Sequence, residues 1–185
     1  MLKKINFHTH TKRCKHAKGE DKDYIDAAIK NNLDILGFSD HGPYPDNRFN
    51  LRMNFNELEE YKSTLEKLKI KFKNFIQIKI GLEIEYLPSD DFYYNYLKNE
   101  LKFDYLALGQ HLFLTENGEL KNTYSLKNTK EYIEYAKSIC LGIKSGYFDF
   151  VAHPDLIFIN DFPWDENCDK ACNLIIDTAK KYDFK

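Results

Sequence analysis

Short apolar runs alternate along this chain with longer segments in which apolar residues recur at helical spacing. The short runs have the length of strands, and several are apolar at nearly every position, which is typical of strands covered on both faces. The longer segments carry apolar residues three or four positions apart, the period of a helix with one buried face. We therefore expect strands at Ile5–His8, Leu33–His41, Ile76–Tyr86, Asp104–His111 and Phe148–Asp155, and helices at Asp21–Asn31, Phe55–Phe72, Ser89–Leu101, Thr129–Ser145 and Asp165–Lys181.

This rhythm predicts an α/β fold with a parallel sheet, because parallel neighbours are joined by crossover segments that are usually helices. The chain has 185 residues, of which 43% are hydrophobic and 15% aromatic, so it can bury a sizeable core. The sequence contains no repeat, low-complexity segment or obvious linker. We expect a single domain over residues 1–185.

Composition narrows the class of protein. Lysine and arginine number 27 against 29 acidic residues, so no general positive field draws the chain to nucleic acid. No apolar run reaches membrane-spanning length, and the first residues resemble no secretory signal. We therefore expect a cytoplasmic protein that binds neither nucleic acid nor membrane. The four cysteines fit no disulfide framework, and we expect reduced thiols, although Cys14, between His10 and His16, could reach a metal ion.

The candidate chemistry lies where the expected strands end. His8 and His10 are two residues apart, so in an extended segment both side chains point to the same side and can hold one ion. A single histidine at a strand end is more often a hydrogen-bonded core residue, but here every expected strand ends with a histidine or a carboxylate. In parallel α/β barrels such ends form the functional face. The set favours zinc, iron or manganese, and more than one ion. Its members are His8, His10, His41, Glu83, Glu85, His111 and His153.

Several short motifs also resemble one known family. They are His8-Thr9-His10, Cys14-Lys15-His16-Ala17, Phe38-Ser39-Asp40-His41, Gly81-Leu82-Glu83-Ile84-Glu85-Tyr86, Gly109-Gln110-His111 and Ala152-His153-Pro154-Asp155-Leu156. With these motifs the chain resembles the polymerase and histidinol phosphatase (PHP) superfamily, and most closely its monofunctional histidinol-phosphatase branch. The resemblance implies a distorted (β/α)7 barrel of the PHP type, with about five of its seven strands present in this chain, and a rim that holds up to three metal ions (zinc, manganese or iron).

The resemblance also assigns roles to individual residues. It implies Glu83 and His111 as catalytic residues and Asp40, Glu85 and Asp155 as groups that orient the ligands. The implied ligands are His8 and His10 for the first metal, Glu83 between the first and the second, His111 and His153 for the second, and His16 with His41 for the third.

A metal cluster of this kind suits the hydrolysis of phosphate esters, because bound ions supply a nucleophile and offset charge on the phosphoryl oxygens. Arg48 and Arg52 follow the second expected strand and are candidate substrate-binding residues, although both could equally be solvated loop charges. The resemblance implies a small phosphorylated substrate, namely L-histidinol phosphate in histidine biosynthesis. The alternatives are another PHP phosphoesterase, such as a nucleotide phosphatase or an exonuclease, and an inactive metal-binding remnant.

The sequence departs from the family pattern at one motif. Members of the superfamily carry an Asp-x-His motif that supplies a ligand to the first metal and another to the third, and this sequence has none. We therefore expect a C-terminally truncated chain that lacks about two strand and helix units. On this expectation Glu83, His111 and His153 form the most complete metal site, and residues 1–185 alone are poorly soluble or loosely folded and only weakly active.

Overall fold

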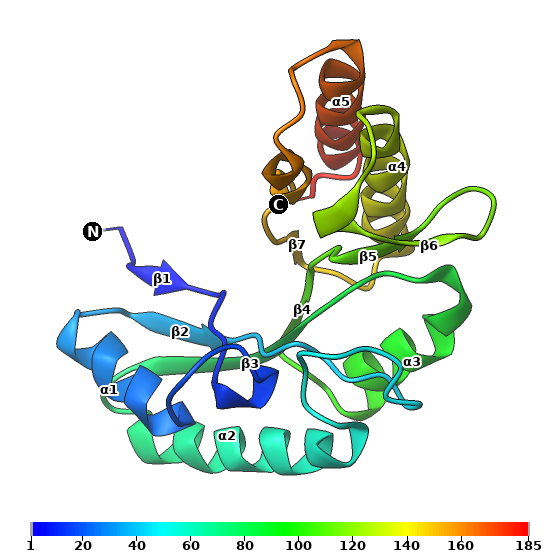
Figure 1. Cartoon of the computed structure of the whole chain (residues 1–185). Helices are drawn as coiled ribbons and strands as arrows, with labels where there is room; N and C mark the ends of the chain where they lie inside the picture. Colours follow the sequence, from blue (N-terminus) through cyan, green and yellow to red (C-terminus); the bar gives the residue numbers. More distant parts are fainter. Residues whose placement is uncertain (1, 185) are drawn as a thin grey trace. The chain divides into compact units, whose positions relative to one another are not determined.

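The computed structural model describes residues 2–184, which form two compact units (Figure 1). The first unit covers residues up to Glu83 together with Phe103–Tyr105, and the second covers Ile84–Lys102 and the residues from Leu106 onward. Strands β3 (Gln77–Ile84) and β4 (Tyr105–Leu108) each contribute residues to both units.

The parallel sheet has the strand order β1-β2-β3-β4-β7, which confirms the α/β expectation and its five parallel strands. In the first unit β1 (Ile5–Asn6) pairs with β2 (Ile35–Phe38), and β2 pairs with β3. Both helices of this unit, α1 (Asp21–Lys30) and α2 (Leu58–Phe72), lie on the same side of these strands (Figure 1).

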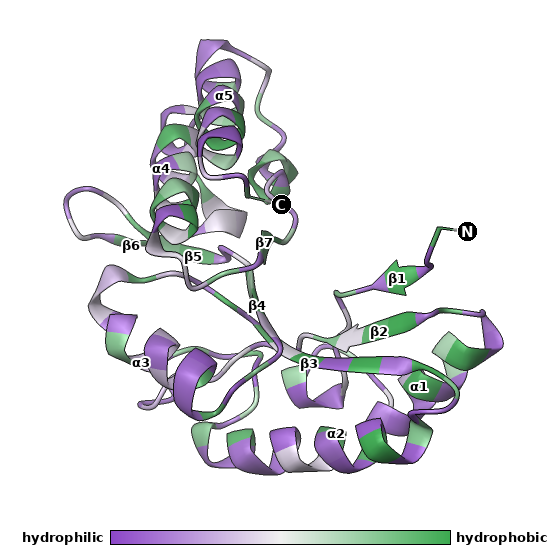
Figure 2. Ribbon diagram, turned by 180° about the vertical axis from the view of Figure 1, so that it is seen from behind, coloured by the Kyte–Doolittle hydropathy of each residue, from purple (hydrophilic) through white to green (hydrophobic). Residues whose placement is uncertain are grey.

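The helices of the first unit begin where the sequence supplies caps. In α1, Glu20 and Asp23 form a reciprocal capping box, and Asn54 with Glu57 does the same for the 3-10 turn Phe55–Glu57 that leads into α2. The segment expected to be helical from Phe55 therefore begins there, as a 3-10 turn that continues into α2 at Leu58. The buried face of α2 consists of Leu58, Tyr61 and Leu65. Figure 2 shows hydrophobic and hydrophilic residues alternating along this helix, as one-sided burial requires.

The second unit contains the parallel pair β4 and β7 (Phe150–Val151) and an antiparallel hairpin of β5 (Leu112–Leu114) and β6 (Leu120–Asn122). Its helices are α3 (Asp91–Asn95), α4 (Lys130–Ser145) and α5 (Glu166–Lys181). Helices α4 and α5 pack side by side (Figure 1). Asp165 caps α5 by accepting hydrogen bonds from the amides of Asn167 and Cys168.

Three details differ from the sequence expectation. The helix expected at Ser89–Leu101 is a 3-10 turn, then α3, then a π-helical turn at Tyr96–Glu100. The β5–β6 hairpin follows directly after His111 and was not expected, because each of its strands has only three residues. Ile176, an apolar residue of the helix expected at Asp165–Lys181, is 46% exposed, since the buried face is centred on Cys168, Ala171 and Thr178.

A tyrosine fixes the packing of the strands in the first unit. The hydroxyl of Tyr105 shares its proton between the carbonyl oxygens of Phe7 and Phe38, at 2.9 and 2.8 Å. Its ring fills the space beside Gly37 and Gly81, where an added Cβ would come within 2.5 Å of a Tyr105 atom. Glycine at these two positions therefore lets the aromatic side chain lie directly against the backbone of β2 and β3.

Candidate metal centre

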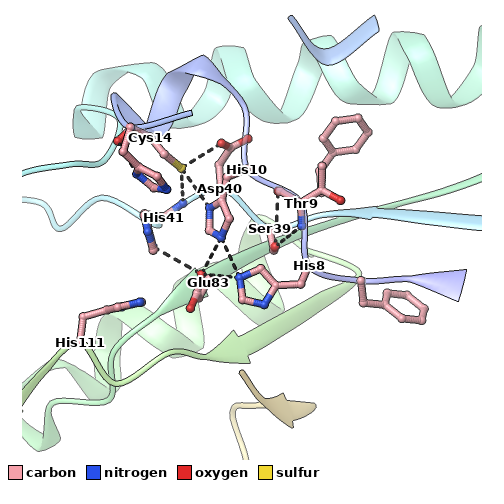
Figure 3. Close-up of polar contacts among 12 residues, drawn as sticks. His8, Thr9, His10, Cys14, Ser39, Asp40, His41, Glu83 and His111 are labelled. Carbon is pink, nitrogen blue, oxygen red and sulfur yellow. Dashed lines mark hydrogen bonds and ion pairs between the residues drawn. The ribbon is translucent and has the colours of Figure 1, made fainter. Parts of the chain in front are cut away.

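His8, His10 and Glu83 converge in the first unit (Figure 3). The Nε2 atoms of His8 and His10 are 2.7 Å apart, and they lie 3.1 and 3.0 Å from Oε2 of Glu83. Ligand atoms around a zinc ion, each at about 2.1 Å from the metal, are separated by roughly 3 Å. Two imidazole nitrogens and a fully buried carboxylate at this spacing fit a divalent metal ion.

The backbone around His8 and His10 explains why both rings point the same way. Strand β1 ends at Asn6, earlier than expected, but the chain continues beside the end of β2. Thr9 donates its amide hydrogen to the hydroxyl of Ser39 at 2.9 Å, and the Ser39 amide donates to the carbonyl of Thr9 at 3.0 Å. Thr9 is thereby buried against Ser39, and the histidines on either side of it lie together as the spacing predicted.

His16 and His41 lie close to the same group. The ring of His41 is 4.5 Å from that of His10 and 5.1 Å from that of His16, measured between centroids. Nδ1 of His41 is 3.5 Å from Oε2 of Glu83. Backbone pairing keeps His41 beside Glu83, because the amide of Glu83 donates to the carbonyl of Asp40 at 3.1 Å and the carbonyl of Glu83 accepts from the amide of Gly42 at 2.8 Å. The ligands that the sequence predicts in this unit are thus brought together.

A buried polar network lies behind these ligands. The carboxylate of Asp40 accepts hydrogen bonds from the amide and hydroxyl of Thr11 and from the thiol of Cys14, at 2.7–3.1 Å. Burial raises the pKa of the Cys14 thiol, and the neighbouring Asp40 carboxylate raises it further, so the thiol is neutral at pH 7. Sequence reasoning identified Asp40 but not Thr11, whose only signal is its place one residue after His10.

In the second unit a smaller group joins Glu85, His111 and His153. Nδ1 of His111 is 3.4 Å from Oε1 of Glu85, and the rings of His111 and His153 are 5.1 Å apart. Glu85 is fully buried. His153 has a φ of 34°, a backbone conformation that residues other than glycine adopt rarely.

Gln110 holds this second group in place, although sequence reasoning gave it no role. Its side-chain amide accepts from the amide of Tyr86 at 2.9 Å and donates to the carbonyl of Tyr86 at 3.0 Å and to the hydroxyl of Ser138 at 2.7 Å. The residues that precede Tyr86 and follow Gln110, Glu85 and His111, are therefore fixed side by side. Asp155, which the family resemblance made an orienting group, lies exposed at the start of the 3-10 turn Leu156–Asn160.

The two candidate phosphate contacts differ in their surroundings. Arg52 is only 6% exposed, and its Nη1 donates to the carbonyl of Gly42, next to His41, at 2.9 Å. It is therefore not a solvated loop charge. Arg48 pairs through Nε with Asp46 at 2.8 Å, and its guanidinium lies 4.6 Å from the centre of the Tyr44 ring.

A cavity of about 340 Å³ opens beside the first group of ligands. One side of its wall comes from residues 6–10, and the other from α1 with its C-cap and from the segment that leads into β2. Its lining residues are Asn6, His8, Thr9, His10, Tyr24, Ala27, Ala28, Asn31, Leu33 and Leu36. Small molecules in this cavity would have direct access to His8 and His10.

Parallel strands that end in histidines and buried carboxylates define an α/β protein built to bind metal ions. The chain belongs to the PHP domain family, whose model matches residues 6–184.

Two curated proteins are similar to this chain. One, from Deinococcus radiodurans and provisionally named histidinol-phosphatase, is 28% identical over 156 residues, and the match covers 80% of this chain. The other, a histidinol-phosphatase from Bacillus subtilis, is 25% identical over 153 residues, and the match covers 75% of this chain. The matches span 59% and 55% of the two relatives' own lengths.

Two solved structures share the fold. The first, from Listeria monocytogenes and provisionally named histidinol phosphatase, has a TM-score of 0.80 at 20% identity over 98% of this chain and 80% of that chain. The second is a histidinol phosphate phosphatase from Lactococcus lactis in complex with zinc, L-histidinol and phosphate, with a TM-score of 0.76 at 19% identity over 100% of this chain and 72% of that chain. The expected PHP-type fold is thereby confirmed. Within residues 2–184, none of the helices has the length and apolarity that crossing a membrane requires.

Proposed function

We propose that this chain belongs to a metal-dependent phosphatase that hydrolyses L-histidinol phosphate to L-histidinol and phosphate. The convergence of His8, His10 and Glu83 carries this proposal, because it places two imidazole nitrogens and a buried carboxylate around one point. The family match and the names of both curated relatives support the reaction class and the substrate.

We further propose that the metal ligands are the six histidines of the chain and Glu83, holding up to three ions of zinc, manganese or iron. The ligands are His8, His10, His16, His41, Glu83, His111 and His153. The donor atoms support this, because imidazole and carboxylate together suit these metals. The zinc in the Lactococcus lactis structure supports it as well. When bound, such ions supply a nucleophile derived from water at neutral pH and offset charge on the phosphoryl oxygens.

The remaining roles follow from the chemistry of the side chains. Glu83 and His111 are the proposed catalytic residues, since each combines a ligating atom with burial or a carboxylate partner. Arg48 and Arg52 are the proposed phosphate contacts, because a guanidinium group can donate two hydrogen bonds to one phosphate. The proposed substrate is small, and the cytoplasmic location and the lack of nucleic-acid binding stay predictions from the sequence.

The substrate proposal is tested by loading the purified chain with zinc, manganese or iron and measuring phosphate release. We expect L-histidinol phosphate to be hydrolysed faster than a nucleoside monophosphate or single-stranded DNA. Glu83→Gln should abolish the activity, and Arg48→Ala should raise the KM without lowering the metal content. Glu66→Gln, on the exposed side of α2, is the matched control and should leave the activity unchanged. A preference for the nucleotide would instead favour a different PHP phosphoesterase.

A further inference from the structure

We propose that Cys14 is a positioning residue that connects the Asp40 carboxylate to the ring of His10 and fixes the tautomer in which Nε2 of His10 can bind a metal ion. The three residues and the amide of His41 are seen together in Figure 3. The inference rests on the proposed metal site only for its functional meaning, since the tautomer itself is a property of the chain.

The hydrogen bond between Cys14 and Asp40 runs from the thiol to the carboxylate. Oδ1 of Asp40 accepts from the amide of Thr11 at 2.7 Å and lies 3.1 Å from the Thr11 hydroxyl. An oxygen that accepts an amide hydrogen in this way acts as an acceptor. The sulfur of Cys14, 3.0 Å from the same oxygen, must therefore direct its single hydrogen toward Asp40.

The sulfur of Cys14 also accepts hydrogen bonds, from the amide of His41 and from the ring of His10. The amide of His41 donates to Sγ of Cys14 at 3.0 Å, and an amide nitrogen in a peptide can only donate. Nδ1 of His10 lies 3.3 Å from the same sulfur. Because the thiol hydrogen is already used for Asp40, the hydrogen between the sulfur and the ring must belong to Nδ1.

The consequence is a defined imidazole tautomer. With its hydrogen on Nδ1, the neutral ring of His10 has its lone pair on Nε2, the atom that faces Glu83 at 3.0 Å and His8 at 2.7 Å. Metal-binding histidines commonly donate their other ring hydrogen to a carboxylate or a carbonyl oxygen, which orients the ring. In this chain the buried thiol of Cys14 accepts the ring hydrogen of His10 and donates its own hydrogen to the carboxylate of Asp40.

Three variants separate this role from simple packing. Cys14→Ala removes both hydrogen bonds of the thiol, whereas Cys14→Ser keeps one donor and one acceptor at nearly the same place. Cys140→Ala is the matched control, because Cys140 is also buried and its thiol donates to a backbone carbonyl, that of Leu174, at 3.4 Å. Any loss that comes only from removing a buried sulfur atom should appear equally in this control.

The direct readout is the nitrogen NMR spectrum of the imidazole rings in the metal-free chain. The His10 signals are assigned by comparison with His10→Gln. We expect Nδ1 of His10 to carry a hydrogen in the unaltered chain, in Cys14→Ser and in Cys140→Ala, and a shift toward the form with hydrogen on Nε2 alone in Cys14→Ala. A predominant Nε2–H form in the unaltered chain would overturn the inference, and so would an unchanged tautomer in Cys14→Ala. This test needs no bound metal, so it stands apart from failure of the proposed function.

Metal binding gives the second readout. Zinc affinity should fall about tenfold in Cys14→Ala, the low end of the effect of losing a group that orients a ligand, and it should be largely kept in Cys14→Ser and Cys140→Ala. The cobalt-loaded chain should lack thiolate-to-metal charge-transfer absorption. His10, Cys14 and His41 offer ligand atoms within 4.8 Å of one another, so a strong band of this kind that disappears in Cys14→Ala would make Cys14 a direct ligand and overturn the positioning role.

Discussion

Asp104 shows how one carboxylate ties α2 to β3, the strand that carries Glu83. Its Oδ2 accepts hydrogen bonds from Nζ of Lys69 on α2 at 2.7 Å and from the amide of Ile80 on β3 at 2.8 Å. Burial by itself raises the pKa of Asp104, but the hydrogen bonds and the charges of Lys69 and Lys79 outweigh it, and the pKa is lowered from 3.8. The ionised form is therefore the form that stabilises the fold.

We predict that Asp104→Asn lowers the free energy of unfolding by about 1 kcal/mol at neutral pH, the usual contribution of one hydrogen bond of this kind. Since the folded pKa lies below the unfolded value of 3.8, the contribution is present above that value and is lost as the pH falls through the folded pKa. Urea unfolding at several pH values measures this. Asp177→Asn, at an exposed position of α5, is the control, and a difference between wild type and Asp104→Asn that does not shrink in acid would contradict the account.

At the scale of elements, β3 depends on close contact with Tyr105. A Cβ added at Gly81 would lie 2.5 Å from Cζ of the tyrosine ring, a distance that real Cβ atoms do not show. The ring is buried, and its hydroxyl is tied to the carbonyl oxygens of Phe7 and Phe38, so it cannot swing away without breaking those hydrogen bonds. The same strand ends one residue after Glu83, so a shift here would reach the ligand.

We predict that Gly81→Ala destabilises the chain by roughly 1–3 kcal/mol, the usual cost of overpacking a close-packed core. Tyr105→Leu also destabilises, but the double variant should be more stable than the sum of the two single effects implies, because the smaller side chain makes room for the methyl group. Thermal unfolding of the three variants measures this. Strictly additive effects would show that the ring and Gly81 are not in contact.

For the molecule as a whole, the sequence predicted the α/β class, the alternation of strands and helices along the chain, and several of the histidines and carboxylates that lie close together at strand ends. These follow from local patterns, namely apolar periodicity and short motifs at strand ends. Two sets of hydrogen bonds could not be predicted: those that join Asp40, Cys14 and His10, and those between the side chain of Gln110 and the backbone of Tyr86. They depend on which buried atoms meet in three dimensions. The β5–β6 hairpin was missed since three-residue strands leave too little periodic signal.

Elemental analysis measures directly whether His8, His10 and Glu83 hold a metal ion. The purified chain is stripped with a chelator, reloaded with zinc and passed through a desalting column, in parallel with His8→Ala, Glu83→Ala and the surface control Glu66→Gln. We predict at least one zinc ion per chain in the wild type and the control, and loss of most of it in His8→Ala and Glu83→Ala. Equal metal content in all four proteins, or none in the wild type, would contradict the account.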